Sequence, residues 1–517
     1  MSSVDLAQTR AAGTEEAAAE RRRALREALR LDREGKHDDR LVALTEIGRT
    51  LSAARDLDEC LALIVELTSD IFDAERSSIF LYDPAKNELV VKVAEGLDRS
   101  SEIRFPATKG LAGYVAKTGQ LLNIPDAYKD RRFNPAADQK FGFRTTSVLA
   151  APLLNHRNDI IGVLQVLNKR DGQPFPKEDE HLIAGVAGQC AVAIENARLL
   201  EEIDNLFEVF IETASQAIEQ RDPTTAGHSR RVTLYSLKLA KAVHNSNWPD
   251  FKDFRYTRER LRQLRYAGLL HDFGKIGVRE AVLCKVNKLL EGDFATMRER
   301  VRRVAAERTT EFLLNQLRAG VTDITQIEAR LAEFATACED CLKFLEAKNQ
   351  SGWINDEDLE RLRVLHNEGI VTDQELTCLA VRRGNLTPPE WDDIRSHVSK
   401  TFLILKDIPW PQDLKEIPRI AHAHHEKLDG SGYPLGISRP DIHFDSQIMT
   451  IADIYDALTA SDRSYKKAMD HENAMRILRD EAQEGKLNWS LVELFDAERC
   501  YMADEEDSQI KIEKKEA

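Results

Sequence analysis

A long proline-free segment constrains the fold of this chain more than any other feature. Between Glu178 and Arg221 apolar residues recur every three or four positions, and Asp204 is the one polar interruption. At 1.5 Å per residue, a continuous helix here would be about 65 Å long. This pattern predicts a coiled-coil helix that connects two domains and pairs with a second copy, and a single amphipathic helix packed on its own domain is the alternative. The predicted seam comprises Ile183, Val186, Cys190, Ala193, Ala197, Leu200, Phe207, Ile211, Ala214 and Ile218.

Length and composition favour a multidomain protein. The chain has 517 residues, more than one hydrophobic core usually organises. Its net charge of -15 argues against nucleic-acid binding, which needs a basic surface. The start lacks the apolar core of a signal peptide, and no stretch has the roughly 20 apolar residues that span a bilayer. Seven scattered cysteines form no disulfide framework, so we expect a cytoplasmic protein without a membrane partner.

The first half predicts an α+β domain. Residues 1–40 read as a helical or flexible tail, and helical periodicity begins near Leu41. Alternating apolar runs then predict strands at 77–83, 88–96, 147–154 and 160–169. We therefore place an α+β sensor domain at residues 41–200, overlapping the connecting helix 178–221.

The second half predicts an all-α domain over residues 205–485, followed by a C-terminal tail at 486–517. A helical stretch at 289–383 keeps a heptad rhythm, and TDQE at 372–375 and TPPE at 387–390 each predict a capping box. Cys338 and Cys341 form a CxxC pair, but both lie on the apolar face of that stretch. They are therefore predicted to be core residues and not zinc ligands.

Histidines and aspartates cluster in the second half. The sequences HDFGK at 271–275 and AHAHHEKLDGSGYP at 421–434 place ionisable residues side by side, where burial requires a partner such as a metal ion. Imidazoles with carboxylates suit Fe, Mn or Zn, and about five His with two Asp exceed the needs of one ion. Two ions about 3.5–4 Å apart clamp phosphoryl oxygens, which predicts phosphodiester hydrolysis. If HDFGK begins a helix, Lys275 shares a face with His271 and Asp272 and can hold the scissile phosphate.

These motifs, with MTIADIYDALTASDRSYKK at 449–467, resemble the HD-GYP family of metal-dependent phosphohydrolases over residues 205–290 and 384–485. The resemblance implies a bridging role for Asp272 and a phosphate contact for Lys275, the two expected catalytic residues. It implies that the metal ligands are His228, His271, Asp272, His397, His424, His425 and Asp453.

The resemblance also implies substrate contacts. Gly432, Tyr433 and Pro434 form the GYP element that marks cyclic dinucleotide specificity in the family, and Arg463 and Lys466 resemble its substrate-contacting cations. The chain departs from the family at three places. Thr224 stands where some relatives have a Glu that holds a third ion, Ser464 interrupts the usual Arg-Pro-Tyr, and the helical insertion at 289–383 splits a segment that is normally continuous.

The first domain resembles a GAF domain with the signature of phosphodiesterase GAF domains. The signature residues are Asn168, Lys169, Phe175, Asp179 and Glu180. The resemblance implies a pocket for a small ligand such as a cyclic nucleotide, whereas the Lys169–Asp179 pair is expected to brace the fold. A GAF domain that only dimerises is the alternative.

The leading hypothesis is a dimeric, GAF-regulated phosphodiesterase that opens cyclic di-GMP to pGpG, with GMP as an alternative end product. It would use two divalent ions, Fe or Mn, with Zn as an alternative. The competing hypotheses are a non-catalytic cyclic di-GMP receptor and an HD hydrolase of another cyclic dinucleotide.

Overall fold

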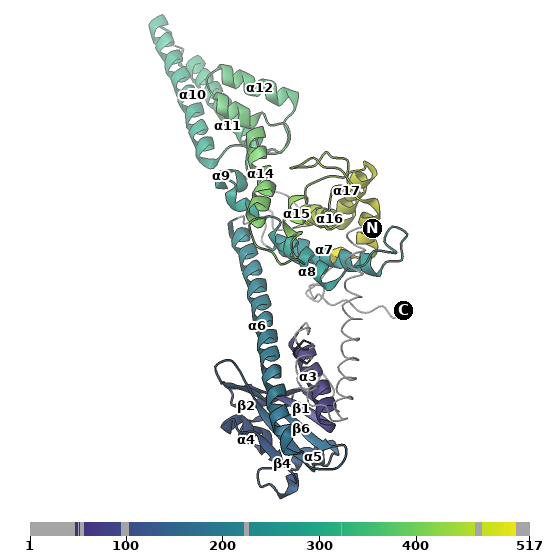
Figure 1. Cartoon of the computed structure of the whole chain (residues 1–517). Coiled ribbons are helices and arrows are strands. Elements are labelled where there is room, and N and C mark those ends of the chain that lie inside the picture. The colour runs from purple at the N-terminus through teal and green to yellow at the C-terminus, as the bar shows by residue number, and fades with distance from the viewer. Residues whose placement is uncertain are drawn as a thin grey trace. The chain divides into compact units, whose positions relative to one another are not determined.

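The computed structural model describes residues 47–49, 51, 56–94, 103–221, 227–321, 323–460 and 468–502. It divides into two compact units, Met1–Glu208 and Val209–Ala517, whose elements are labelled in Figure 1. Six features of the sequence analysis lie outside the described residues: the tail 1–40, Thr224, Arg463, Ser464, Lys466 and residues 503–517 of the expected C-terminal tail.

The N-terminal unit is built on a six-stranded antiparallel sheet with the order β3-β2-β1-β6-β5-β4. All four predicted strands are confirmed, and the two that the sequence did not predict, β3 and β4, are the short edge strands. The strands are β1 (Ala74–Asp83), β2 (Glu88–Ala94), β3 (Ile103–Pro106), β4 (Leu122–Ile124), β5 (Val148–Leu154) and β6 (Ile160–Lys169).

Successive side chains of a strand point to opposite faces of the sheet, and apolar side chains build a core on each face. Leu164 and Val166 of β6 belong to the core that includes α3 (Leu57–Phe72) and the first part of α6 (Lys177–Arg221). Val163 instead packs in a second core with α4 (Gly110–Thr118). The short elements η1 (Ala127–Lys129) and α5 (Ala136–Phe141) lie between β4 and β5 in sequence.

The predicted connecting helix is confirmed as a single helix, α6, but most of its predicted seam does not face outward. Ile183, Val186 and Cys190 are buried in the core of the N-terminal unit, and Ile211 and Ile218 are also buried. A 3/4 spacing indicates an apolar face without showing what covers it. Leu200 is the predicted seam residue that is exposed, and the other exposed apolar residues of α6 lie outside the seam, at Val192, Leu199, Ile203, Leu206, Val209 and Phe210.

All regular elements among the described residues of the C-terminal unit are helices. Its main core joins α7 and α8 to α16, α17 and α18. The expected C-terminal tail from residue 486 therefore begins later, because Leu491 and Phe495 of α18 are buried in this core. None of the described helices has the length and apolar character needed to cross a membrane. The elements outside the insertion are α7 (His228–Asn245), α8 (Arg258–Leu270), η3 (Phe273–Gly277), α9 (Glu280–Leu283), α14 (Pro388–Leu405), α15 (Ile417–His422), α16 (Phe444–Thr459), α17 (His471–Gln483), α18 (Trp489–Ala497) and η4 (Cys500–Met502).

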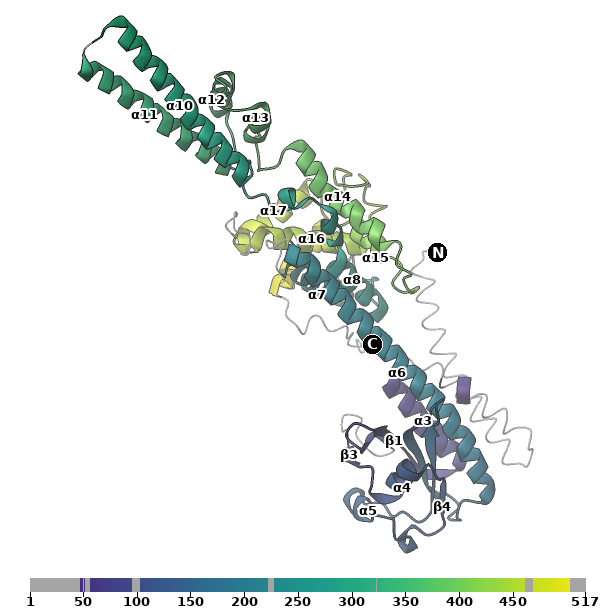
Figure 2. The same ribbon diagram turned by 90° about the vertical axis from the view of Figure 1, so that its left-hand side faces the viewer.

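The insertion has a core of its own. Its long helices α10 (Glu291–Ala319) and α11 (Ile324–Gln350) run side by side as a hairpin (Figure 2), followed by α12 (Asp356–Asn367) and α13 (Asp373–Leu379). Cys341 is buried in this core with Cys338 packed against it, as predicted. Both predicted capping boxes are present, at Thr372 and Thr387, where they begin α13 and α14.

Candidate metal centre

Five separate segments of the C-terminal unit bring the predicted metal ligands together. The residues lie at the start of α7, directly after α8, within α14, directly after α15 and within α16. Two triads have ligand atoms within 4.8 Å of one another, and each could hold a metal ion: His228, His271 and Asp272, and His397, His424 and His425. Asp453 connects the two triads, because its carboxylate lies 3.2 Å from Nε2 of His228 and 3.5 Å from Nδ1 of His425.

The segment HDFGK does not begin an α-helix as expected. The helix α8 ends at Leu270, and residues 273–277 form the 3-10 helix η3. The predicted pairing is present all the same, since Nζ of Lys275 lies 2.8 Å from Oδ2 of Asp272 and the lysine side chain is only 15% exposed. Lys275 is therefore directed at the candidate ligands and is not a surface lysine.

A close backbone approach holds this turn against α14. A Cβ at Gly274 would lie 2.0 Å from the carbonyl oxygen of His397, so only glycine fits. The hydroxyl of Thr401 accepts a hydrogen bond from the Gly274 amide at 2.8 Å and donates one to the carbonyl of His271 at 3.0 Å. These contacts fix the spacing between the HD turn and His397.

Three of the histidines share one hydrogen-bonding arrangement. In His271, His397 and His424, Nδ1 lies 2.6–2.7 Å from the carbonyl oxygen three residues earlier. A bond to a carbonyl requires a proton on Nδ1 and leaves Nε2 as an acceptor. All three Nε2 atoms are buried without a hydrogen-bond partner among the described residues. Since buried polar atoms are normally paired, this convergence fits a bound metal ion.

His228 is oriented differently, by residues that the sequence analysis did not single out. Its Nδ1 lies 2.7 Å from Oδ2 of Asp456, and Arg231 donates to both oxygens of the same carboxylate at 2.6 and 3.0 Å. A carboxylate behind a histidine is the usual outer partner of a metal-binding imidazole. The available signal was spacing, because Asp456 follows Asp453 by one helical turn and Arg231 follows His228 by one turn.

The electrostatics of the cluster favour neutral imidazoles at His271, His424 and His425 beside ionised carboxylates. His228 differs: burial opposes its charged form, but hydrogen bonds to Asp453 and Asp456 raise its pKa to about 9. Burial lowers the pKa of His271 and His424, and lowers that of His425 to about 4. Burial opposes ionisation of Asp272, but Lys275 and the neighbouring imidazole of His271 hold its pKa well below the usual range. Neutral imidazole and carboxylate are the forms that bind a divalent ion.

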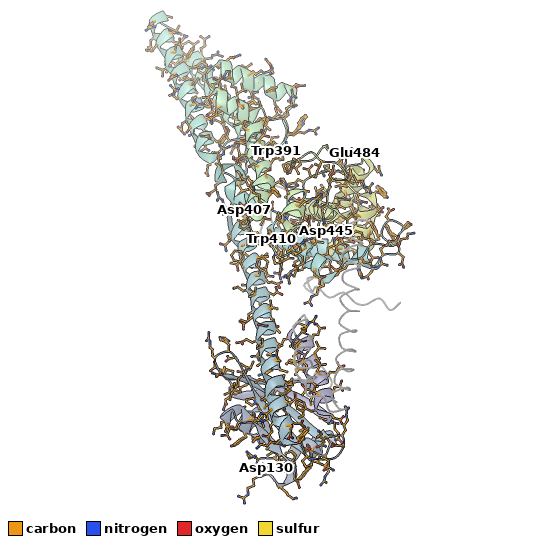
Figure 3. All side chains as sticks on the ribbon, in the orientation of Figure 1. Asp130, Trp391, Asp407, Trp410, Asp445 and Glu484 are labelled. Atoms are coloured by element: carbon orange, nitrogen blue, oxygen red, sulfur yellow. The ribbon has the colours of Figure 1, made fainter. Side chains whose placement is uncertain are left out.

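The helix that carries Asp453 and Asp456 is anchored at its first turn. Asp445, labelled in Figure 3, is fully buried in α16. It accepts a hydrogen bond from the hydroxyl of Tyr256 at 2.6 Å and from Nη2 of Arg260 at 2.9 Å. This buried ion pair fixes α16 against α8, whose other end presents His271.

The GYP element lies against the cluster through a tilted contact between two aromatic rings. The ring of Tyr433 lies 4.8 Å from the ring of His425, and the guanidinium of Arg395 lies 4.5 Å from the Tyr433 ring. The buried Glu426 accepts hydrogen bonds from the amides of Leu435 and Gly436, at 2.6 and 3.2 Å. A Cβ at Gly432 would lie 2.3 Å from the amide nitrogen of Lys427, which explains the glycine.

The GAF signature residues lie where β6 meets the start of α6, and each makes a contact within the N-terminal unit. The side chain of Asn168 bonds to the amide of Thr146 at 2.7 Å and to the carbonyl of Arg144 at 2.8 Å. Lys169 lies 3.5 Å from Asp179, and Asn123 of β4 donates to the carbonyl of Phe175 and to the Glu180 carboxylate, both at 3.0 Å. These contacts brace the fold.

Comparison with known protein families identifies two kinds of domain in this chain. A GAF domain model matches residues 56–194, and two HD domain models match residues 225–381 and 322–491. A GAF domain is therefore followed by a helical region with an HD domain. The ranges of the two HD models include all seven predicted metal ligands.

Similar curated proteins are cyclic nucleotide phosphodiesterases. The chain is 35% identical over 158 residues to probable 3',5'-cyclic phosphodiesterase pde-5 of Caenorhabditis elegans, covering 28% of this chain and 21% of that protein. It is 33% identical over 199 residues to dual 3',5'-cyclic-AMP and -GMP phosphodiesterase 11A of Takifugu rubripes, covering 34% and 22%. The match thus spans about a fifth of the length of each relative.

Two solved structures are among the similar folds. The GAF domain of an Acinetobacter phosphoenolpyruvate-protein phosphotransferase is 23% identical with a TM-score of 0.28, covering 32% of this chain and 97% of that one. The GAF domain/HD domain protein from Geobacter sulfurreducens is 21% identical with a TM-score of 0.25, covering 29% and 98%.

Proposed function

We propose that this chain is a metal-dependent phosphodiesterase that hydrolyses a cyclic nucleotide second messenger. The observation that carries the proposal is the set of three buried, unpartnered Nε2 atoms beside ionised aspartates. The HD domain match and the phosphodiesterase names of the curated relatives support the same reaction class.

Under this proposal the seven predicted ligands would hold two divalent ions. Asp272 belongs to the first triad, and its carboxylate also lies 3.2 Å from Nε2 of His397 in the second. Iron or manganese suits a set of imidazoles and carboxylates, and zinc is the alternative. Bound there, such ions would supply a neutral-pH nucleophile from water and stabilise charge on the phosphoryl oxygens.

The chain's own side chains orient this chemistry. The carbonyl-bound Nδ1 atoms present the Nε2 lone pairs, and Asp456 holds the His228 ring. Lys275 provides a cation beside Asp272 that can hold a substrate phosphate. Arg395 and Tyr433 form a stacked surface next to His425, which suits a base or a phosphate of the substrate.

We propose cyclic di-GMP as the substrate and pGpG as the first product. The intact HD and GYP motifs support a cyclic dinucleotide, and the curated relatives make cyclic AMP and cyclic GMP the substrates to compare. Because the curated relatives are cyclic nucleotide phosphodiesterases, we also propose a cyclic nucleotide as the ligand of the GAF domain.

We also propose that the chain dimerises through the exposed stripe of α6, defined as Val192, Leu199, Ile203, Leu206 and Phe210. Their spacings of seven, four, three and four residues follow a heptad, and the exposed Asn196 occupies the position four residues after Val192. Leu at d with Ile at a favours a parallel pair, and one Asn at an a position fixes register.

The test is hydrolysis of a panel of nucleotides by full-length protein reconstituted anaerobically with Fe(II) or Mn(II). The panel contains cyclic di-GMP, a hybrid cyclic dinucleotide, cyclic AMP and cyclic GMP, and the control is Asp272→Ala. We expect linear pGpG from wild type alone. Tight binding of cyclic di-GMP without turnover would contradict the enzyme hypothesis and favour a cyclic di-GMP receptor. Turnover of another substrate alone would overturn the cyclic di-GMP assignment.

A further inference from the structure

The last turns of α6 contact the backbone on both sides of His228. Oε2 of Glu219 accepts a hydrogen bond from the Gly227 amide at 2.9 Å, and Oε1 accepts one from the Ser229 amide at 3.0 Å. These amides belong to the first turn of α7, where backbone N–H groups lack helical partners and a carboxylate is favoured. One side chain of α6 therefore fixes the residue before and the residue after a candidate metal ligand.

The final residue of α6 contacts the segment that follows the HD turn. Nη1 of Arg221 donates to the carbonyl of Ile276 at 2.8 Å, and Nη2 donates to the carbonyl of Val278 at 3.2 Å. Ile276 lies one residue after Lys275 in η3. The fixed fork of the guanidinium makes this a directional contact that a single ammonium group would not reproduce.

A third contact of α6 acts on the helix that precedes the HD turn. Glu212 lies 2.8 Å from Nη2 of Arg265 in α8, and α8 ends directly before His271. Three charged residues of one helix end thus contact α7, α8 and η3. These are the three elements that present the triad His228, His271 and Asp272, and all lie in the C-terminal unit.

No hydrogen bond or ion pair joins the described residues of α6 to the histidines of the other triad. His397 belongs to α14, and His424 and His425 follow α15. Their supports come from their own helices, through the carbonyls of Ile394 and Ala421. A displacement of the end of α6 would therefore act on one triad before the other.

We propose that Glu219 and Arg221 form a positioning clamp through which α6 sets the geometry, and hence the metal occupancy, of the triad His228, His271 and Asp272. This inference rests on the proposed role of those residues as metal ligands. Because α6 is continuous from Lys177 in the GAF domain to Arg221, movement of the helix along or about its axis reaches the clamp. Ligand atoms must be held within about 0.5 Å of productive geometry, so small displacements suffice. Through the clamp, the GAF domain would regulate the C-terminal unit by changing metal binding at one of the two positions.

The test is titration of metal-free full-length protein with Mn(II), followed by the electron paramagnetic resonance signal of free Mn(II). Wild type is compared with Glu219→Ala, Glu219→Gln, Arg221→Ala and Arg221→Lys. The matched control is Glu201→Ala, which removes an exposed glutamate from the same helix. Thermal unfolding of each metal-free variant reports whether the fold is retained.

We expect wild type and the control to bind two ions. Glu219→Ala and Arg221→Ala should weaken the binding of one Mn(II) ion by about 10–100-fold, the range found for outer partners of metal ligands. The affinity for the other ion should be unchanged. Glu219→Gln should fall between wild type and Glu219→Ala, since the amide keeps one acceptor oxygen. If Glu219→Ala does not fold, Glu219→Gln and Arg221→Lys carry the comparison.

Two results would overturn the clamp. One is unchanged binding of both ions in Glu219→Ala and Arg221→Ala, and the other is equal loss of both ions together with a lower unfolding temperature, as a purely structural role predicts. Failure of wild type itself to bind Mn(II) would instead contradict the proposed function, so the two failures are distinguishable.

Discussion

At the scale of single residues, the cluster depends on partners that lie behind the ligands. Asp456 holds the His228 ring at 2.7 Å while bound by Arg231. We expect Asp456→Asn to weaken metal binding by about 10–100-fold, because the amide is a poorer acceptor for Nδ1–H and leaves Arg231 without its anion. Isothermal titration with Mn(II) measures the change. Asp441→Asn, an exposed carboxylate of the same unit, is the control, and equal affinity of both variants would contradict this role.

A second residue-scale prediction concerns backbone proximity. Gly274→Ala places a Cβ 2.0 Å from the carbonyl oxygen of His397, so the HD turn must shift away from α14. We expect a loss of about 1–3 kcal/mol in the free energy of unfolding, with weaker metal binding. Gly292→Ala, where no atom lies within 4 Å of the added Cβ, should be neutral or stabilising. Urea unfolding of both variants checks this, and equal stability would show that the turn is free to move.

At the scale of elements, α14 begins with a capping box that positions the helix carrying His397. Thr387 and Glu390 bond reciprocally, and Lys285 lies 2.8 Å from the same glutamate. Thr387→Ala should cost about 1 kcal/mol of stability, since it leaves orphan amides at the helix start. Thr310→Ala on the exposed face of α10 is the matched control and should cost less. Chemical denaturation that ranks the two variants in the opposite order would contradict the assignment.

The stripe of α6 gives a second prediction at this scale. Leu206 is 71% exposed and Phe210 63% exposed, so a partner helix would remove two large apolar side chains from water. We expect Leu206→Glu to convert a dimer to a monomer in sedimentation experiments. Leu317→Glu, which changes an equally exposed leucine on α10, should leave the dimer intact. A monomeric wild type would remove the stripe as a dimer surface.

The elements also show what the sequence could and could not predict. The strands β1, β2, β5 and β6 follow from alternation, whereas β3 and β4 are too short to carry a period. The apolar spacing predicts the helix α6. The same spacing is expected for a helix buried in its own unit and for one that pairs with a partner, so it does not distinguish the two. The seam was therefore assigned to residues such as Ile183 and Ile211, which the structure buries.

At the scale of the whole molecule, the adjacent pairs His271–Asp272 and His424–His425 marked candidate ligands by residue type, whereas His228, His397 and Asp453 came from the resemblance to the HD-GYP family. Their supports were not predictable in the same way. Helical spacing places Asp456 one turn after Asp453 and Arg231 one turn after His228, but it does not show that these side chains meet, because the contacts join segments up to 228 positions apart. No spacing of this kind pointed to Glu219. The 3-10 geometry after Asp272 likewise depends on Gly274 meeting α14, a tertiary contact.

The central claim is that the two triads of the C-terminal unit, with Asp453, hold two metal ions. The most direct measurement is the metal content of full-length protein reconstituted anaerobically with Mn(II) or Fe(II), determined by mass spectrometry of the metal, for wild type and for His424→Ala. The account predicts two ions per chain in wild type and fewer in His424→Ala, with cyclic di-GMP hydrolysis lost in step. Wild-type protein that retains no ion after reconstitution would contradict it.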